Sequence, residues 1–575
     1  MNTEVYKQIF ELKTENQNKT NEINEIKSIN KKLMNTLTIL NNKYNQLELK
    51  FENYKENEKE RIEKAVKEAE IKKDKEYQEI INSLETKIKN LESLLNINST
   101  NSGIPTSKEK IGRHTIQNNR EKSDKSIGAQ KNHEQHKLNY FSDEEITETI
   151  EHKLDKCPKC GGKLIEKNIV LSDVLDIEIT IKKTRNKIYN YKCSCCHKDI
   201  TANKELPRGV TYGNNINSIA LSMMNESNTA LNKITTFFSG ITNNEVNLSE
   251  GYLIKLQKRS AKGLEDFNQK LKEQVVSLKN VFWDDTVCKF GIEKSEEGYD
   301  KKDIEYLEKR KQEESKNNIR NGIIRFYGND NWALLIGHRN KNEDSLKDDG
   351  ILGVLPKTCV VMHDHLLINY NDKFSFKNAE CNEHTKRYLK KNMDIFPKHD
   401  WAKEMRNLLI DTNNRKQINI KNKINSFTQL ELEEISNSYD DIIKKGYLEN
   451  EKVDLTYIKD KCDEKNLIER LETFKENHLL FAYDYSVEFT NNTSERGLRQ
   501  VKRKLAVSFM FKNANRMKDY ATILSYLETC YRNGISRYDA SKRLIENNPY
   551  TIDELKKIIE KKMKKFKISS PFMCV

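Results

Sequence analysis

Three acidic positions in this chain are placed where carboxylates could do chemistry. Asp284 and its neighbour Asp285 interrupt the apolar run LKNVFWDDTVCKFGI, and Asp364 follows the apolar run TCVVMH. A charge in a buried strand is costly unless it has a function. Glu495 opens a later helical stretch, TNNTSERGLRQVKRKLA. Carboxylate oxygens are the ligands that Mg²⁺ prefers, so an Asp–Asp–Glu set could hold two such ions for phosphoryl transfer.

Each of these acids also has a purely structural interpretation. Asp284 and Asp285 could simply end a strand, and Asp364 could belong to a turn. Glu495 could be part of a helix start, in which Asn492 is the N-cap and the glutamate reaches back from the third helical position. The residues by themselves leave both interpretations open.

Two Cys-x-x-Cys pairs form a second candidate site. Cys157 and Cys160 lie in CPKCGGKL, and Cys193 and Cys196 lie in CSCC, where Cys195 could replace Cys196. Four thiolates at this spacing are typical of a tetrahedral Zn²⁺ site. The alternating stretches IEITIKKT and KIYNYKC between the pairs predict strands. We therefore expect a zinc ribbon, which either contacts DNA or only stabilises its own domain.

A strand meander must position the first two acids. The stretch around Asp284 has the pattern of a buried strand, GIIRFYGND and NWALLIGHRN follow as the next two strands, and TCVVMHDHL carries Asp364. Carboxylates at the ends of neighbouring strands can share metal ions. Before Glu495, the residues from Phe396 to His478 repeat apolar positions at helical spacing. They predict a helical insertion that could contact DNA or a second protomer.

The N-terminal region has a heptad pattern. Its apolar residues follow in alternating steps of three and four: Leu33, Leu37, Leu40, Tyr44, Leu47, Phe51 and Tyr54. This spacing, which resumes from Tyr77 to Leu95, predicts a coiled coil and self-association. A solitary charged helix that folds back on the protein is the alternative. The polar, basic residues that follow indicate a linker, used as a spacer or for phosphate contact.

Two further segments bear on DNA binding. LNKITTFFSGI and NLSEGYLIKLQKRSA predict two helices around a turn that contains glycine. They fit a helix-turn-helix that reads DNA, with simple packing helices as the alternative. The C-terminal KKIIEKKMKKFK is a basic helix that we expect to be a solvated tail.

Bulk composition favours a large protein with a polyanionic partner. The 575 residues exceed what one hydrophobic core organises. The net charge of +13 favours nucleic acid or an acidic membrane surface over a neutral small molecule. No apolar run of about 18 residues and no secretory signal is present. The cysteines are too sparse for a disulfide scaffold, so we expect a soluble protein of a reducing compartment.

The order of the motifs is similar to that of a known family. CPKCGG, YKCSCC, LPRG, WDDT, AECNEHTKR and FTNNTSERGLR resemble the successive motifs of the insertion sequence 66 family of transposases. KSIGAQKNHEQHKL resembles that family's basic Gly-Gly-Gln-Pro-Gly-His segment in a degenerate form. The resemblance covers about residues 100–545. It implies a helical N-terminus, a zinc-binding domain and a ribonuclease H-like domain that cuts and joins DNA at the ends of a mobile element.

The resemblance also implies roles for single residues. Asp284, Asp364 and Glu495 match the family's catalytic acids, which would hold two Mg²⁺ or Mn²⁺ ions, and Asp285 is the less favoured neighbour of the first.

Four other residues match the motifs as supporting groups. Cys381 and His384 match a Cys-x-x-His segment that would stabilise the fold or position the substrate. Arg496 and Arg499 follow the third acid, and Arg499 lies one helical turn beyond it, where it could contact a phosphate. Ordinary surface arginines are the alternative.

The chain departs from the family pattern near the second acid. HDHLLINYND keeps Asp364 and Tyr370 but lacks a glycine that the family usually has. The charged run from Glu293 to Asn321 is longer than the usual hairpin. A catalytically inactive, DNA-binding derivative is therefore the alternative function. Because all three acids are present, we expect an active DDE transposase that uses a two-metal mechanism.

We therefore predict a multidomain α+β protein of the cytoplasm, associated with the nucleoid of a bacterial-type cell and with no membrane. Its expected partners are the terminal repeats of the element, target DNA, a second copy of the chain and companion proteins encoded by the same element. The predicted parts are a coiled coil (1–98), a basic flexible linker (99–145), a zinc-binding domain (146–205), a helical, helix-turn-helix-like DNA-binding segment (206–275), a ribonuclease H-like catalytic domain (276–545) with a helical insertion at about 390–480, and a basic C-terminal tail (546–575).

Overall fold

The computed structural model describes residues 3–55, 78, 81, 84, 138–203, 206, 208–293, 301–312, 318–451 and 463–569. Contacts divide the chain into two units, Met1–Asn96 with Glu451–Asp460, and Ile97–Asn450 with Lys461–Val575. Most of the predicted linker and most of the second half of the predicted coiled coil lie outside the described residues. Among the helices that are described, none is long and apolar enough to cross a membrane.

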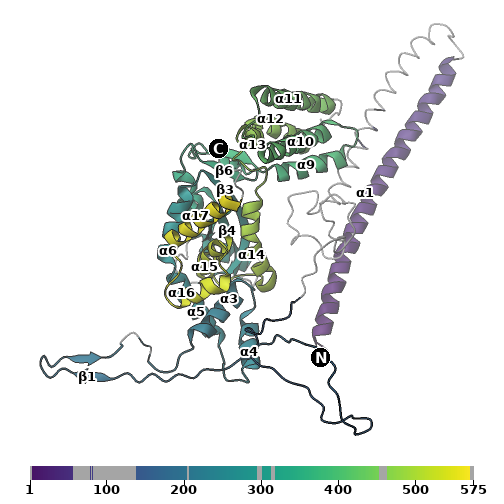
Figure 1. Ribbon diagram of the computed structural model, residues 1–575. Coiled ribbons are helices and arrows are strands. Elements are labelled where there is room, and N and C mark those ends of the chain that lie inside the picture. Colours follow the sequence, from purple (N-terminus) through teal and green to yellow (C-terminus); the bar gives the residue numbers. More distant parts are fainter. Residues whose placement is uncertain are drawn as a thin grey trace. The chain divides into compact units, whose positions relative to one another are not determined.

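The N-terminal unit contains one long helix, α1 (Thr3–Lys55), which is drawn in purple in Figure 1. The stretch contains neither Gly nor Pro, the two residues that most disfavour a helix. The predicted helix is therefore present over these residues. The apolar residues of the heptad seam are 38% to 56% exposed, namely Leu33, Leu37, Leu40, Tyr44 and Leu47.

The segment 138–203 has little regular structure. Two short strands, β1 (Asn190–Lys192) and β2 (Asp199–Thr201), pair in antiparallel fashion. The stretch IEITIKKT was expected to be a strand, but it forms none. Its Ile177 and Ile179 side chains are 83% and 56% exposed. An alternating pattern makes a strand only where a neighbouring strand can pair with it. No strand lies beside this stretch among the described residues, although its Ile181 packs against a buried apolar core.

Four helices precede the main sheet, in the region where the sequence predicted a helical segment with two helices around a turn. They are α3 (Asn214–Asn225), α4 (Leu231–Ile241), α5 (Glu250–Lys262) and α6 (Glu265–Val276). The side chain of Ser249 caps α5 by accepting from the Tyr252 amide. Gly240 lies inside the last turn of α4, so the connection between α4 and α5 does not depend on a glycine.

The central element is a five-stranded mixed sheet with the order β5-β4-β3-β6-β7. The strands are β3 (Asn280–Gly291), β4 (Ile319–Gly328), β5 (Ala333–His338), β6 (Val360–His363) and β7 (Lys377–Glu380). β3, β4 and β5 form the predicted antiparallel meander. β6 then pairs parallel to β3, and β7 pairs parallel to β6.

Short helices fill the connections between these strands. α7 (Lys301–Gln312) lies between β3 and β4, and α8 (Glu343–Asp349) follows β5. The 3₁₀ turns η2 (Leu352–Val354) and η3 (Leu367–Tyr370) come before and after β6.

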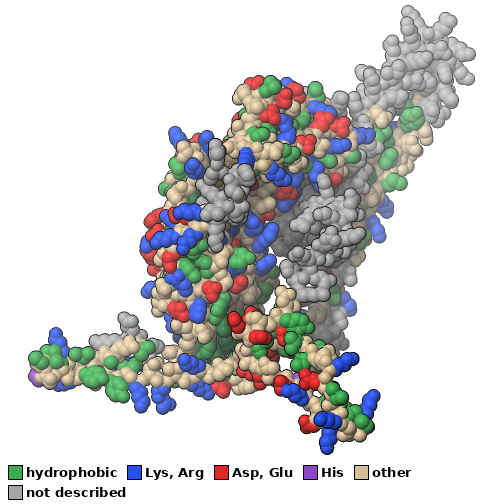
Figure 2. Space-filling view, in the orientation of Figure 1, with side chains coloured by type: hydrophobic (Ala, Val, Ile, Leu, Met, Phe, Trp, Pro, Cys, Tyr) green, Lys and Arg blue, Asp and Glu red, His purple; other side chains and the backbone are tan. Residues whose placement is uncertain are grey.

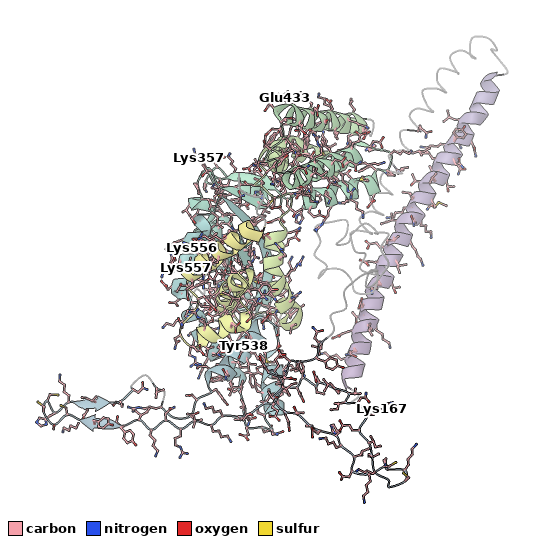
Figure 3. The ribbon with its side chains drawn as sticks, viewed as in Figure 1. Lys167, Lys357, Glu433, Tyr538, Lys556 and Lys557 are labelled. Atoms are coloured by element: carbon pink, nitrogen blue, oxygen red, sulfur yellow. The ribbon has the colours of Figure 1, made fainter. Side chains whose placement is uncertain are left out.

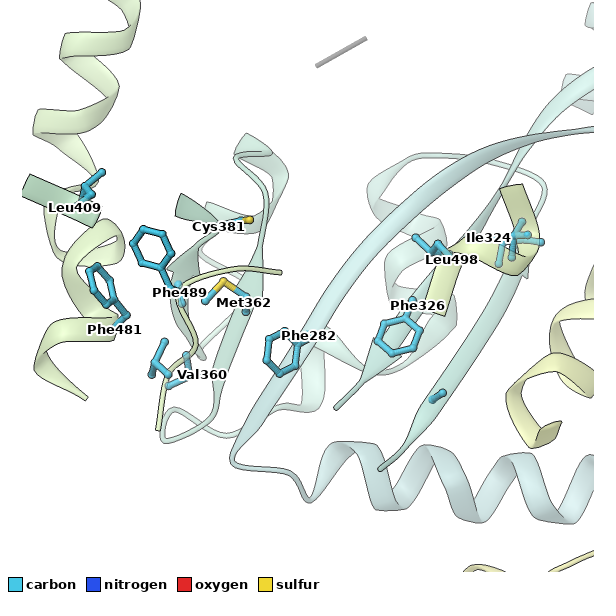
Figure 4. Packing of buried hydrophobic residues seen from close by; sticks show 14 of the residues in the cluster. Phe282, Ile324, Phe326, Val360, Met362, Cys381, Leu409, Phe481, Phe489 and Leu498 are labelled. Carbon is cyan, nitrogen blue, oxygen red and sulfur yellow. The ribbon is translucent and has the colours of Figure 1, made fainter. Parts of the chain in front are cut away.

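Helices cover both faces of the sheet, because alternate residues of each strand enter different cores. One core contains Phe282 and Phe326 together with Leu498 of α14 (Asn492–Ser508), as Figure 4 shows. The opposite core contains Trp283 and Tyr327 with side chains of α3 to α6. The core between β3 and α14 is the one that borders the candidate acids.

Helix α15 (Ala514–Arg532) protects the free edge of the sheet. The hydroxyls of Ser525 and Thr529 accept from the amides of Leu335 and Ala333 on β5, at 2.8 and 3.1 Å. The same hydroxyls donate to the carbonyls of Leu335 and Ala333, both at 3.2 Å. Four residues along a helix span about 6 Å, and two residues along a strand span about 7 Å. The spacing of the Ser525 and Thr529 hydroxyls along α15 therefore matches the spacing of the Leu335 and Ala333 backbone groups along the edge of β5.

The predicted helical insertion is present and begins directly after β7. It comprises α9 (Asn382–Ile395), α10 (Trp401–Lys421), α11 (Gln429–Glu451), α12 (Asp463–Thr473) and α13 (Lys475–Tyr483). Figure 1 shows these helices gathered on the β6 side of the sheet. Trp401, Leu409 and Phe481 are fully buried and join the core that contains Phe282.

The C-terminal region is packed rather than solvated over its first turns, in contrast to the tail that the sequence predicted. α16 (Arg537–Ile545) is followed by α17 (Ile552–Ser569). Ile552 and Leu555 are buried in the core that contains Trp283. The lysines Lys556 and Lys557 stay exposed, and Figure 3 labels them at the outer surface. The basic residues therefore form one face of an amphipathic helix.

Candidate active site

The acids Asp284 and Asp285 lie in the middle of β3 and point to opposite faces of the sheet. Their β4 partners in the register are Phe326 for Asp284 and Arg325 for Asp285. Neighbouring residues of a strand alternate between faces, so Asp284 lies on the Phe326 side, which α14 covers. Asp285 forms an ion pair with Lys341 at 2.9 Å. Only Asp284 is directed to the region between β3 and α14.

The second acid lies next to the first across the sheet. β6 runs parallel to β3, and Met362 of β6 lies opposite Phe282 of β3. Asp284 comes two residues after Phe282 and Asp364 comes two residues after Met362, so the two acids lie side by side. Both carboxylates are half-buried. Burial, and then the negative charge of Asp364, raise the pKa of Asp284 well above its ordinary value. A carboxylate whose ionisation is opposed by a neighbouring carboxylate fits a site for a divalent cation, which would relieve the repulsion.

The third acid comes from the helix that packs on β3. The Asn491 side chain donates to the Trp283 carbonyl at 2.8 Å, and the Asn491 amide donates to the Cys381 sulfur at 3.2 Å. These bonds attach the start of α14 beside Asp284. Glu495 follows one turn later and is half-buried. The N-cap of α14 is Asn491, which makes no side-chain cap hydrogen bond. The alternative helix start, with Asn492 as the N-cap and Glu495 at the third helical position, is therefore not formed.

The three acids do not form a closed cluster in this structure. Among the described residues, no group of three or more His, Cys, Asp and Glu side chains is arranged to hold a metal ion. Asp284 and Asp364 are brought together, and Glu495 lies on the adjoining helix. Burial, with a contribution from the charge of Glu495, raises the pKa of Cys381 to about 12. That contribution shows that Glu495 is near the buried Cys381 thiol.

The four supporting residues have different environments. Arg496 pairs with Asp330 at 3.0 Å, and both side chains are more than half exposed. Arg499 is exposed one turn beyond Glu495. Cys381 is fully buried at the start of α9. His384 is half-buried, and its Nδ1 atom has no hydrogen-bond partner within the described part of the chain.

Sequence reasoning missed two residues of this region. Lys502 is exposed two turns beyond Glu495 on α14, and its charge opposes the rise in the pKa of Asp284. The spacing of seven residues from Glu495, which keeps both on one helix face, was the signal that could have identified Lys502.

Glu380 is the second residue that sequence reasoning missed. It ends β7, beside His363 in the β6–β7 register, and is only 1% exposed.

Glu380 is held by side chains from three segments. Its carboxylate lies 2.6 Å from His365 Nδ1 and accepts from the Tyr370 hydroxyl at 2.5 Å. Arg470 of α12 donates to its other oxygen at 3.2 Å. Burial alone would raise the pKa of Glu380, but the His365 hydrogen bond and nearby positive charge, including that of Arg470, hold it below the ordinary value. The buried carboxylate is therefore ionised.

Each cysteine pair forms a turn typical of a zinc knuckle, but the two turns are not brought together. The Cys157 amide donates to the Gly162 carbonyl at 3.0 Å, and the Cys193 amide donates to the Lys198 carbonyl at 2.9 Å. Gly161 in the first turn adopts a left-handed φ of +72°, which a glycine accommodates without strain. The four sulfurs form no metal-holding group within the described residues.

Backbone amides favour the thiolate form in both turns. Hydrogen bonds from the backbone of Lys159 and Cys160 lower the pKa of Cys157, and those from Cys196 and Cys195 lower the pKa of Cys193. The Cys196 amide lies 3.5 Å from the Cys193 sulfur. A lowered thiol pKa prepares a cysteine for metal binding.

On the face of the molecule seen in Figure 2, the distribution of charge does not by itself indicate a path for DNA. Figure 2 shows Lys and Arg side chains spread over the visible face and interspersed with acidic ones. The helix that carries Glu495, α14, also carries four exposed basic residues: Arg496, Arg499, Lys502 and Arg503.

Comparison with known proteins identifies the region that contains the acids. Residues 209–518 match the family model described as "Transposase IS66 family". The match covers more than half of the 575 residues, from just before α3 into α15, and it includes all three acids but not the cysteine pairs. No curated protein and no solved structure matches the chain.

Proposed function

Because the chain belongs to the transposase IS66 family, we propose that it is an active enzyme that cuts and joins DNA at the ends of a mobile element. The observation that carries the proposal is the position of Asp284 on β3 beside Asp364, which directly follows the parallel strand β6, so that the charge of Asp364 opposes the ionisation of Asp284. Such a pair is unfavourable in an empty site and becomes favourable when it binds a divalent cation. We further propose that the sheet and its helices form a ribonuclease H-like domain.

Asp284, Asp364 and Glu495 are the residues that would hold the metal. When bound, two Mg²⁺ or Mn²⁺ ions would activate the attacking oxygen and stabilise the leaving oxygen. The carboxylates would supply hard oxygen ligands, with Glu495 completing the set from α14. Arg499 and Lys502 on the same helix would contact backbone phosphates and hold the strand beside the acids.

The experiment that tests this function compares two neighbouring acids. Purified full-length protein is incubated with labelled DNA that carries the element ends, with Mg²⁺, with Mn²⁺ and with a chelator. We expect metal-dependent cleavage that is lost in Asp284→Ala and retained in the matched control Asp285→Ala, because Asp285 faces the other side of the sheet. Binding without cleavage in the wild type would favour the inactive, DNA-binding derivative. Cleavage by Asp284→Ala would remove that residue from the site.

We also propose that the two knuckles bind one Zn²⁺ ion through Cys157, Cys160, Cys193 and Cys196. The lowered pKa values of Cys157 and Cys193 support it. Three thiolates complete a tetrahedral site poorly, so we expect Cys157→Ser to lose most of the zinc measured in the purified protein. Cys195→Ser is the matched control and should keep it. Full zinc content in Cys157→Ser would exclude this ligand set.

A further proposal concerns self-association through α1. Its seam residues are exposed at heptad spacing, and an exposed apolar seam is buried when two such helices pack together. A second copy of the chain is the proposed occupant, because the heptad pattern that makes the seam is present on both copies. The element ends come in pairs, so a dimer would present two active sites to two DNA ends.

A further inference from the structure

The loop that carries Asp364 is fixed on both sides by side chains that reach β7. Before the acid, His363 Nε2 lies 2.8 Å from the Asn378 side chain, and its Nδ1 lies 2.8 Å from the Asp364 carbonyl. After the acid, His365 Nδ1 lies 2.6 Å from Glu380. The two residues that flank Asp364 are therefore each attached to β7, and the direction of the acid between them depends on these attachments.

Glu380 also holds the far end of the same loop. Tyr370, at the end of η3, donates to Glu380 at 2.5 Å. The rings of His365 and Tyr370 both pack on Phe474, with centroids 4.9 and 4.2 Å away. Tyr370 is the tyrosine that the sequence motif kept near the second acid, and its hydroxyl contact gives a physical reason for its presence.

The third partner of Glu380 comes from the helical insertion. Arg470 on α12 donates to Glu380 at 3.2 Å, and its side chain is 14% exposed. Phe474 precedes α13 directly. Since α12 and α13 belong to the insertion, the loop with Asp364 is connected to the insertion through one buried carboxylate. A buried charge costs several kcal/mol unless it is paired, and here its three partners compensate that cost.

We propose that Glu380 is a positioning residue that orients Asp364 for metal binding through His365 and Tyr370, and that Arg470 makes this orientation depend on the helical insertion. The proposal rests on the proposed function. Groups that orient metal ligands without touching the metal commonly change metal affinity by about 10- to 100-fold when they are removed. A role in stability alone would leave metal affinity unchanged.

Glu464 provides a matched control. It is a carboxylate in the same insertion, 1% exposed, 2.9 Å from His399 and 2.5 Å from the Trp401 indole nitrogen. It therefore resembles Glu380 in burial and in having a histidine partner, and its hydrogen bonds to His399 and Trp401 lie outside the loop that carries Asp364.

The test is titration calorimetry of full-length protein with Mn²⁺, together with thermal unfolding. We expect Glu380→Gln to lower Mn²⁺ affinity at least about 10-fold, and Tyr370→Phe to lower it less. Glu464→Gln should lower the unfolding temperature by a similar amount with unchanged affinity. Asp364→Asn defines the affinity that remains without the second acid. Tyr370→Phe removes only a hydroxyl and serves if Glu380→Gln does not fold.

The outcomes separate this proposal from the proposed function. If the wild type binds Mn²⁺ and both Glu380→Gln and Tyr370→Phe bind it equally well, Glu380 has only a structural role and the proposal is wrong. If the wild type itself binds no Mn²⁺ and cleaves no DNA, the metal-dependent function is wrong, and the positioning role falls with it.

Discussion

Asp284 and Asp285 are neighbours in the sequence with opposite environments in the protein. Asp285 has a lysine partner on one face of the sheet, and Asp284 faces Asp364 and α14 on the other. The difference follows from strand alternation, which directs successive side chains to opposite faces.

Removal of one acid should separate cleavage from DNA binding. We expect Asp364→Asn or Glu495→Gln to abolish cleavage, because a neutral amide is a poor ligand for a hard cation. Binding to the element ends should stay within a few-fold of the wild type, since phosphate contacts come from other side chains. Cleavage assays and gel shifts with the same DNA measure the two effects. Cleavage that survives either change would exclude that residue from the metal site.

Close packing of α14 on the sheet depends on one glycine. A Cβ atom at Gly497 would lie 2.4 Å from the Phe326 ring and 3.2 Å from the Arg532 side chain. We expect Gly497→Ala to destabilise the protein by about 1–3 kcal/mol, the usual cost of overpacking, and to reduce cleavage by displacing Glu495.

Gly240 in α4 is the control for this change. A Cβ atom there would meet no atom within 4 Å, so Gly240→Ala should stabilise by roughly 0.5–1 kcal/mol through helix propensity alone. Thermal unfolding measures both variants. Equal effects of the two alanines would contradict the close contact between α14 and β4.

The edge of the sheet is protected by a helix rather than by another strand. Exposed strand edges promote pairing with other chains, and α15 prevents this at β5 through Ser525 and Thr529. The sheet can therefore end at β5 while its buried amides remain hydrogen-bonded.

Loss of one of these buried hydroxyls should lower the free energy of unfolding more than loss of an exposed hydroxyl does. We expect Thr529→Val to destabilise by about 1–3 kcal/mol, because the buried Ala333 amide is left without a partner. Thr473→Val is the control, since the exposed Thr473 hydroxyl donates to the carbonyl of Glu469 in its own helix. Its effect should be within about 0.5 kcal/mol. Chemical unfolding of both variants measures the difference, and equal losses would argue against edge protection.

The molecule combines a compact unit, which contains the acids, with a long helix whose apolar seam is exposed. An exposed apolar seam is more stable when it packs against a second helix than when it is in contact with water. The proposed dimer would therefore form through residues far along the chain from the active site, so assembly and catalysis can be tested separately.

A charge on the seam should dissociate the proposed dimer. We expect the wild-type protein to be a dimer and the Leu40→Glu variant to be a monomer, because two like charges would face each other in the packed seam. Asn42→Glu is the matched control on the opposite side of α1 and should leave the mass unchanged. Sedimentation equilibrium distinguishes these results. A monomeric wild type, or a dimer in Leu40→Glu, would refute assembly through this seam.

Local patterns in the sequence determined the elements and the family. The heptad spacing predicted a helical coiled coil over residues 1–98, of which the helix Thr3–Lys55 is described. The apolar runs predicted β3 to β6, and the motif order predicted the transposase family. These features depend on residues a few positions apart, which is the range over which periodicity and turn chemistry act.

The tertiary structure decided everything that depends on distant pairing. It determined that Asp284 rather than Asp285 faces Asp364, that Glu380 joins the second acid to the insertion, and that the first turns of α17 are packed. The stretch IEITIKKT had a strand pattern, yet no partner strand lies beside it among the described residues. Side-chain environment is set by neighbours that the chain brings together over long distances, and a local pattern contains no record of them.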